Sequence, residues 1–234
     1  MQIFRTRAFR RAKRTLKQLV GRDVWTSPQL RCKTLRFGDW CVCPDALDRG
    51  ARVYSLGVEE AIAFDLALIE RFGADVFAFD PTPNTVEWMS RTAVPDSFRF
   101  YPVGVSSANG TARFYPRVDR HGAISRKTFT TVCEDATRDH GIDVAMKRLD
   151  SIMAELGHDR IDLLKMDIEG CEYAVIDQLV ENRIPVRQLL VEFHHRWKSI
   201  GGRRTLDAIA RLNSMGYRIF FISETGREYS FLKV

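Results

Sequence analysis

The sequence lacks the patterns that define several common classes of protein. Its five cysteines form no CxxC pair and no zinc-type spacing with histidine, so we expect reduced thiols rather than a disulfide framework or structural zinc. No segment approaches the roughly 18 consecutive apolar residues of a membrane span. The N-terminal charges are not followed by an apolar run with a cleavage site, so no secretory signal is predicted. We therefore expect a cytoplasmic protein.

Acidic residues are absent from residues 1–22, which contain eight Lys and Arg. The formal net charge of +6 belongs to this leader, because the remaining 28 basic and 30 acidic residues nearly cancel. The body is therefore not predicted to bind nucleic acid. A helix over residues 1–20 would place Phe4, Ala8, Ala12, Leu16 and Leu19 along one side. Such a helix would contact anionic lipid or an acidic partner and bring the protein to a membrane, or simply dock weakly on the body.

The GxGxxG pattern of nicotinamide-binding proteins is also absent, although residues 51–81 have the periodicity of a strand, turn, helix and strand. Ile62, Leu66 and Ile69 recur at helical spacing between two apolar runs. In such a right-handed unit, the turn at 55–60 and Asp80 both emerge at the carboxyl edge of a parallel sheet. A ligand at this edge would meet the backbone N–H groups of the turn and the Asp80 carboxylate.

The rest of the chain continues to alternate between strand and helix patterns, which predicts an α/β fold with helices on both faces of the sheet. Strands are expected at 98–103, 144–149, 161–166 and 188–193, and helices at 83–91, 151–156 after an Asp150 cap, 172–182 and 203–215. The runs 217–222 and 227–232 are close enough only for an antiparallel hairpin. A mostly parallel, seven-stranded sheet that ends in such a hairpin is typical of the Rossmann-like class I methyltransferase fold.

Two segments are expected to lie outside this regular sheet. Residues 33–37 and 40–43 predict a hairpin around Gly38-Asp39, so we divide the chain into an appendage of residues 1–50 and a domain of residues 51–234. Residues 105–115 carry an Asn-Gly turn between strand-like flanks. Residues 117–139, which include His121-Gly122, have weak periodicity and are interpreted as a loop over the site or as a segment without function.

Over roughly residues 33–234, the sequence resembles the FkbM family of methyltransferases. The motifs that carry the resemblance are Tyr54-Ser55-Leu56-Gly57-Val58, Ala78-Phe79-Asp80-Pro81, Pro102-Val103-Gly104-Val105, Leu163 to Glu172 (LLKMDIEGCE) and Val191-Glu192-Phe193-His194. The resemblance implies transfer of a methyl group from S-adenosylmethionine to a hydroxyl of a sugar, polyketide or similar metabolite. It also implies cofactor contacts by Val105. The sequence departs from the usual pattern at Glu59, where such proteins commonly have a second glycine.

Four residues near the first βα turn are candidates for binding the cofactor. Gly57 allows close approach of the backbone. Asp80 would accept hydrogen bonds from both ribose hydroxyls, or would cap the helix that follows Pro81. Ser55 and Glu59 are expected to make weaker contacts, since a Glu59 carboxylate would repel the carboxylate of the methionine moiety and attract its ammonium group.

The candidate catalytic residues follow the next two strands. Asp167 would orient the acceptor hydroxyl, accept its proton or stabilise the sulfonium charge, and Glu169 extends the acidic cluster. Glu192 and His194 lie two residues apart and face the same side, and a neutral His194 is a candidate general base near pH 7. These four residues would alternatively bind a divalent ion.

Two neighbouring residues have structural interpretations. Glu172, one turn into its helix, would interact favourably with the helix N-terminus. His195 is expected to be structural.

Two other functions stay open at this point. The βαβ unit would serve a nicotinamide-dependent oxidoreductase, although the missing GxGxxG and the closing hairpin speak against it. A non-catalytic nucleoside-binding module, tethered by its basic leader, is the other. The sequence predicts a small-molecule or glycan substrate, but neither the acceptor nor the oligomeric state.

Overall fold

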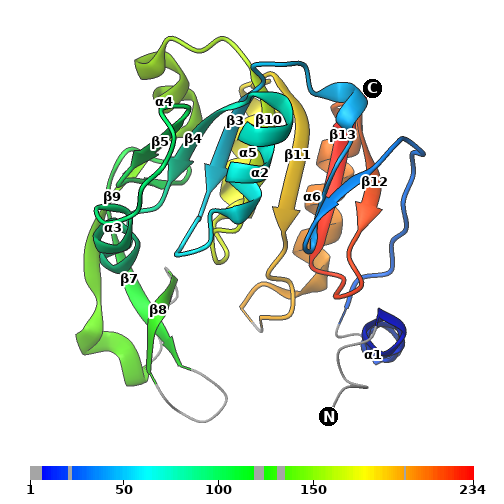
Figure 1. Cartoon of the computed structure of the whole chain (residues 1–234). Helices are drawn as coiled ribbons and strands as arrows, with labels where there is room; N and C mark the ends of the chain where they lie inside the picture. The colour runs from blue at the N-terminus through cyan, green and yellow to red at the C-terminus, as the bar shows by residue number, and fades with distance from the viewer. Residues whose placement is uncertain (1–6, 21–22, 119–123, 131–134, 198) are drawn as a thin grey trace.

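The structure is a computed structural model, which describes the chain except residues 1–6, 21–22, 119–123, 131–134 and 198 (Figure 1). Its centre is a seven-stranded sheet in the order β12-β13-β11-β10-β3-β4-β5. The strands are β3 (Arg52–Leu56), β4 (Asp75–Phe79), β5 (Phe98–Tyr101), β10 (Ile161–Met166), β11 (Val186–Glu192), β12 (Tyr217–Ile222) and β13 (Glu228–Lys233).

The five strands from β11 to β5 run parallel, and β13 pairs antiparallel with both β11 and β12. Leu56 is in register with Phe79 on one side and with Met166 on the other, so β3, β4 and β10 end at one level. The residues that follow these strands therefore meet at one edge of the sheet.

Alternation along the strands divides the core into two layers. In β3, Val53 packs on the face covered by α2 (Ala63–Phe72) and α3 (Pro83–Met89), whereas Tyr54 packs on the opposite face. That opposite face is covered by α4 (Leu149–Leu156), α5 (Glu172–Glu181) and α6 (Gly201–Ser214). The period of two places successive side chains on opposite faces, so a strand buried on both sides is apolar throughout.

A second sheet is inserted between β5 and β10, in the order β6-β9-β7-β8. It comprises β6 (Gly104–Val105), β7 (Gly110–Val118), β8 (Ile124–Thr130) and β9 (Ile142–Lys147), with the short helix η3 (Asp135–His140) before β9. The predicted Asn109-Gly110 turn lies between two strands, β6 and β7, which each pair with β9 rather than with each other. The interpretation of residues 117–139 as a loop is wrong in part, because it contains β8 and η3; His121 lies outside the described residues.

The N-terminal region packs near β11 and β13, at the end of the main sheet away from the inserted sheet (Figure 1). It contains α1 (Arg7–Leu19), β1 (Leu35–Phe37), β2 (Trp40–Val42) and η2 (Pro44–Ala46). β1 and β2 pair antiparallel around Gly38-Asp39, as predicted. The buried side chain of Gln188 in β11 holds this hairpin, since its Nε2 donates to Cys43 O at 3.0 Å and its Oε1 accepts from Cys43 N at 2.8 Å.

One local feature differs from the sequence prediction. Arg148, not Asp150, precedes α4; Asp150 lies in the first turn, where its Oδ1 accepts from Ser151 N at 2.8 Å.

Among the described residues, no helix has the length and apolar character needed to cross a membrane.

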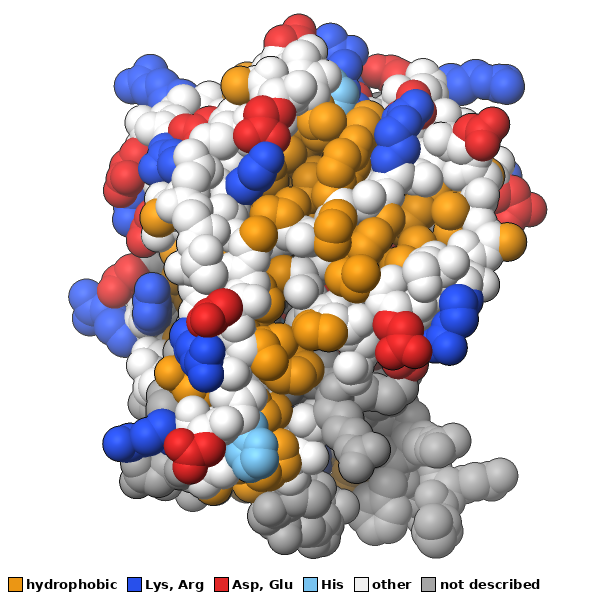
Figure 2. Space-filling model, turned by 90° about the vertical axis from the view of Figure 1, so that its left-hand side faces the viewer, with side chains coloured by type: hydrophobic (Ala, Val, Ile, Leu, Met, Phe, Trp, Pro, Cys, Tyr) orange, Lys and Arg blue, Asp and Glu red, His pale blue; other side chains and the backbone are white. Residues whose placement is uncertain are grey.

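The face of the molecule beside β5 and the inserted sheet is shown in Figure 2. Hydrophobic side chains gather along its centre and charged side chains along its rim. This face lies at the β5 end of the main sheet, where the seven-strand order stops.

Candidate active site

The turn after β3 brings two strand ends into contact. Gly57 has a φ of 74°, and a Cβ atom at this position would lie 1.8 Å from the Asp167 carbonyl oxygen. No side chain fits there, so glycine is required both for the left-handed backbone and for the close approach of β10. Gly57 and Asp167 thereby form one rigid junction.

The Asp80 carboxylate, which follows β4, is buried and holds this turn. Its Oδ2 accepts hydrogen bonds from Val58 N at 3.2 Å and from Glu59 N at 3.0 Å. Its Oδ1 accepts from Thr82 N at 2.9 Å and from Thr82 Oγ1 at 2.6 Å, just before α3. The structure thus gives the carboxylate a role in shaping the turn and the start of α3, and a contact with ribose stays a prediction.

A narrow cavity of about 50 Å³ lies beside this turn, between the main and inserted sheets. Gly57, Glu59, Asp80 and Val105 line it, as the sequence predicted for a cofactor site. The remaining wall is largely apolar: Phe79, Pro81, Phe114, Phe129, Met146 and Ile168. Asp167 and Glu169 lie at its acidic end.

Ser55 does not belong to this site. Its side chain is fully buried, it lines neither this cavity nor the cleft described below, and it lies next to Asp65 of α2. Burial raises the pKa of Asp65, although the charge of Lys165 and the Ser55 hydroxyl oppose the shift. The predicted cofactor contact is therefore corrected: this position of β3 faces the layer under α2.

Glu59 adopts a backbone conformation that favours glycine. Its φ is 45°, so the chain keeps a left-handed turn where a second glycine was expected. Burial raises the pKa of its carboxyl group to about 7, and the charges of Asp167 and Glu169 add to the shift. Glu169 is likewise left-handed, with a φ of 48°. Strained backbone of this kind is concentrated at functional sites.

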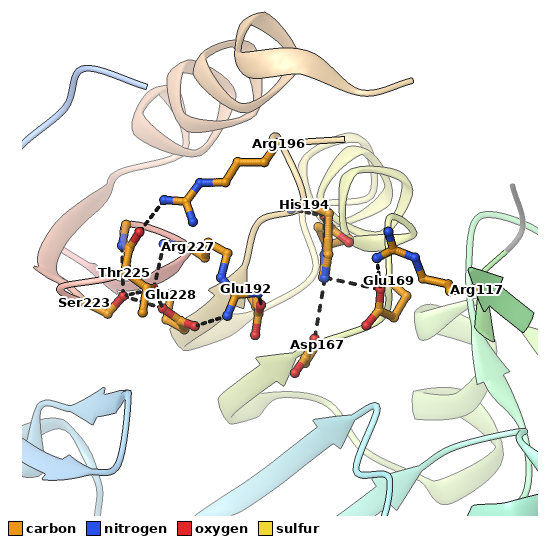
Figure 3. Close-up of polar contacts among 12 residues, drawn as sticks. Arg117, Asp167, Glu169, Glu192, His194, Arg196, Ser223, Thr225, Arg227 and Glu228 are labelled. Carbon is orange, nitrogen blue, oxygen red and sulfur yellow. Dashed lines mark hydrogen bonds and ion pairs between the residues drawn. The ribbon is translucent and has the colours of Figure 1, made fainter. Parts of the chain in front are cut away.

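Carboxylates converge on His194 beyond the ends of β10 and β11 (Figure 3). His194 Nε2 lies 3.5 Å from Glu169 Oε2 and 3.9 Å from Asp167 Oδ1. On the other side of the ring, Glu172 Oε1 accepts from His194 N at 3.0 Å and lies 3.2 Å from Nδ1. The structure therefore brings together the three residues predicted to be catalytic.

These contacts overturn the expectation that His194 is neutral near pH 7. Burial lowers the pKa of His194, but the hydrogen bond and charge of Glu172, with Glu169 and Asp167, outweigh it and raise the pKa to about 9. The imidazole is therefore protonated at neutral pH and acts as a cation among carboxylates. The fully buried Glu172 is a positioning residue for His194, beyond the helix-terminus role that its sequence position indicated.

Glu192 extends the acidic cluster toward β13. Burial raises the pKa of its carboxyl group to about 8, and the Asp167 charge acts in the same direction. Its carboxylate forms an ion pair with Arg227, which also lies 3.5 Å from Glu228. One ligand atom each from Asp167, Glu192 and His194 lie within 4.8 Å of one another. These are three of the four residues predicted as an alternative metal site, and Glu169 is not part of this group.

A broad cleft of about 580 Å³ opens on the other side of Asp167. Its wall includes Trp40 of the N-terminal hairpin, Glu59, Lys165 and Glu192. Lys165 Nζ donates to Gly57 O at 3.1 Å and lies 5.1 Å from the centre of the Trp40 ring. Trp40 is thus half-buried: it packs against the hydrophobic core and also lines the cleft.

Sequence reasoning missed several residues of the site. Arg117 of β7 lies 4.0 Å from the centre of the Trp197 ring and 3.5 Å from Glu169. Arg227 reaches the site from the β12–β13 turn. No local pattern marks either arginine, whereas Lys165 stands inside the LLKMDIEG motif and was open to recognition.

The sheet order, the glycine turn and the acidic carboxyl edge define an α/β protein with a mostly parallel sheet, a class in which ligands commonly bind beyond the carboxyl ends of the strands. The family model for the methyltransferase FkbM domain matches residues 48–219. The chain belongs to the FkbM methyltransferase family, which confirms the resemblance seen in the sequence.

Curated relatives are similar over parts of the chain. Methyltransferase sdnD of Sordaria araneosa is 28% identical over 174 residues, which is 62% of this chain and 65% of the relative. The 2-O-methyltransferase NoeI of Sinorhizobium fredii is 29% identical over 130 residues, 51% of this chain and 54% of the relative. Probable methyltransferase-like protein 24 of Homo sapiens is 38% identical over 176 residues, 68% of this chain and 38% of the relative. The chain thus spans less than two thirds of the length of these relatives.

Proposed function

We propose that this protein is an S-adenosylmethionine-dependent O-methyltransferase that acts on a hydroxyl of a sugar or related metabolite. The position of Asp167 carries the proposal, because this residue lines both the narrow cavity and the broad cleft. A carboxylate at the junction of two cavities lies where a donor and an acceptor would meet. Membership of the FkbM family and the name of the 2-O-methyltransferase NoeI support it.

The residues present fit S-adenosylmethionine, which supplies a methyl group activated by a cationic sulfur. Phe79, Val105 and Met146 form an apolar wall suited to an adenine ring. Glu59 and Asp167 provide negative charge suited to the ammonium and sulfonium groups. At about 50 Å³ the cavity is smaller than such a ligand, so we expect it to widen when the cofactor binds.

Asp167 is assigned the role of orienting the acceptor hydroxyl and accepting its proton. Its side chain is 34% exposed, whereas that of His194 is 5% exposed, so the carboxylate is the group that an acceptor reaches. The protonated His194 holds Asp167 and Glu169 in place and partly balances their charge. The rest of the catalytic effect comes from aligning the two reactants.

Substitution of Asp167 tests this role. With isotope-labelled S-adenosylmethionine and a panel of sugars and glycans, D167N should lower turnover by about 100-fold or more. Its affinity for S-adenosylmethionine, measured by calorimetry, should change by less than about tenfold. The control D207N alters an exposed carboxylate on α6 and should match the wild type. Turnover that survives D167N removes this residue from the mechanism.

Parallel titrations separate the remaining functions. Binding of NAD without binding of S-adenosylmethionine would overturn the proposal in favour of an oxidoreductase. Binding of S-adenosylmethionine with no methyl transfer to any glycan, lipid, polyketide or peptide of a broad panel would favour a binding module.

A divalent cation at Asp167, Glu192 and His194 is a second candidate, favoured by the convergence of their ligand atoms. Such an ion would lower the pKa of the acceptor hydroxyl. Because the ion must displace a proton from His194, its affinity should rise with pH. Calorimetry with Mn²⁺ should show binding that E192Q weakens, and full activity after exhaustive chelation would dismiss the ion.

A further inference from the structure

A cavity of about 490 Å³ lies beyond His194, between α1, the segment after β11 and the β12–β13 turn. Five cationic side chains line it: Lys13, Arg14, Lys17, Arg196 and Arg227. Asp39 is the one carboxylate among its lining residues. The cavity is therefore strongly positive, in contrast to the neighbouring acidic cluster.

Two of these cations have carboxylate partners. Arg196 pairs with the buried Asp23, and Arg227 pairs with Glu192. In the described part of the chain, Lys13, Arg14 and Lys17 of α1 form no ion pair with an acidic side chain. Burial lowers the pKa of Lys17, and the charges of Arg196 and Lys13 lower it further. Gathering these charges costs free energy unless an anion joins them.

Buried donors point to the same conclusion. Arg14 Nε and Nη2 and Arg196 Nε are buried and form no hydrogen bond of normal length within the described residues, although Arg14 lies close to the Tyr229 hydroxyl. Gly226 makes room for Arg14, since a Cβ atom on this glycine would lie 2.5 Å from Arg14 Nε. Hydrogen bonds fix the end of α1, where Gln18 Nε2 donates to Val24 O at 2.8 Å. Unsatisfied buried donors are rare in proteins and call for a partner.

The cavity adjoins the candidate active site. His194 belongs to its wall, and Asp39 and Arg227 line both this cavity and the broad cleft. In Figure 3, Arg227 reaches Glu192, whereas Arg196 extends to the backbone carbonyl of Thr225. A ligand long enough to span this cavity and the adjoining cleft would reach Asp167, which lines the cleft.

We propose that this cavity binds the phosphate or diphosphate group of the methyl acceptor, which is then a phosphorylated sugar or glycan with its reacting hydroxyl at Asp167. The assignment rests on the proposed methyltransferase function. A phosphate group carries more charge than a carboxylate and presents three acceptor oxygens, which suits several Lys and Arg side chains better. The guanidinium groups of Arg14 and Arg196 match its geometry.

Calorimetric titration of the full chain with inorganic pyrophosphate tests the cavity. The wild type should bind, K13Q/K17Q should bind about tenfold more weakly or worse, and R14Q should weaken binding similarly. The matched control R91Q/R203Q removes two charges from exposed positions elsewhere and should bind like the wild type. Pyrophosphate should also shift the His194 ring signals in NMR spectra. No binding by the wild type, or equal binding by every variant, overturns the proposal.

Titration with S-adenosylmethionine keeps the two proposals distinguishable. K13Q/K17Q should bind this cofactor like the wild type, because neither lysine lines the narrow cavity. A wild type that binds the cofactor but not pyrophosphate overturns the anion cavity alone. A wild type that binds pyrophosphate but not the cofactor overturns the methyltransferase and the assignment of the phosphate to its acceptor.

Co-sedimentation with vesicles of equimolar phosphatidylcholine and phosphatidic acid identifies the source of the phosphate. Sedimentation that pyrophosphate and K13Q/K17Q both abolish supports a lipid-linked acceptor. Pyrophosphate binding without sedimentation supports a free phosphorylated acceptor. If the chain does not bind pyrophosphate, and neither pyrophosphate nor K13Q/K17Q abolishes its sedimentation, the proposal is contradicted. That result would favour binding to a lipid surface.

Discussion

The narrow cavity beside Asp167 and the cationic cavity beyond His194 are built in opposite ways. The narrow cavity has an apolar wall, and its buried Asp80 is fully engaged by hydrogen bonds within the protein. The region beyond His194 has charged walls, and several of its buried donors form no hydrogen bond of normal length within the described residues. The polar group of the narrow cavity is thus already bound by the protein, whereas the cationic cavity has hydrogen-bond donors that a polar ligand would engage.

The largest expected effect tests the rigidity of the first region. G57A places a methyl group 1.8 Å from the Asp167 carbonyl oxygen and should lower the free energy of unfolding by about 3 kcal/mol. Urea denaturation measures the loss. The control G157A introduces a similar left-handed alanine into open space and should cost only about 1 kcal/mol. Equal losses would show that the junction is not the reason for the glycine.

The next effect tests the acidic cluster around His194 through Glu172. E172Q removes the carboxylate next to His194 Nδ1 and should lower the pKa of His194 below about 9, followed by NMR titration. It should also cost about 1–3 kcal/mol in stability, because the buried imidazolium loses its charged partner. E181Q, at an exposed position of the same helix, should change stability by less than about 0.5 kcal/mol. An unchanged His194 pKa in E172Q would refute the positioning role.

The acidic cluster around His194 should make stability depend on pH. The folded state raises the pKa of His194 from 6.5 to about 9, so this stabilising contribution is complete below pH 6.5 and is lost as the pH rises through 9. It also raises the pKa of Glu192 from 4.5 to about 8, so the folded state again binds more protons. The titration of these two groups should therefore lower the stability as the pH rises from about 4.5 to 9.

Thermal melts across this pH range check the sign. E192Q should flatten mainly the lower part of the profile and H194Q mainly the upper part. A wild-type stability that rises through this window would contradict the charge assignments.

The smallest expected effect concerns Glu59, which lines the narrow cavity and the broad cleft. E59G relieves a left-handed glutamate and removes a carboxylate of raised pKa, so stability should increase by about 1 kcal/mol. Urea denaturation with E60G as the control checks this, since Glu60 is not left-handed. A more stable E59G that binds S-adenosylmethionine more weakly would show that the strain is kept for function.

Prediction from sequence succeeded where a local pattern has a single structural solution. The apolar runs and the helical spacing of Ile62, Leu66 and Ile69 led to the central unit, and the ends of parallel strands then had to share one edge. It failed where the pattern was weak, as in residues 117–139, which contain a strand pairing and a short helix. It failed also at Ser55, because alternation decides the face of a strand but not which face carries the ligand.

The sequence by itself determined the alternation of strands and helices, the glycine at position 57 and the placement of acids after the strands, because these follow from local sterics and periodicity. Only the tertiary structure decided that Asp80 closes the turn, that His194 is protonated and that cations of α1 face the site. The physical reason is that burial and charge act through space, between groups brought together from distant parts of the chain.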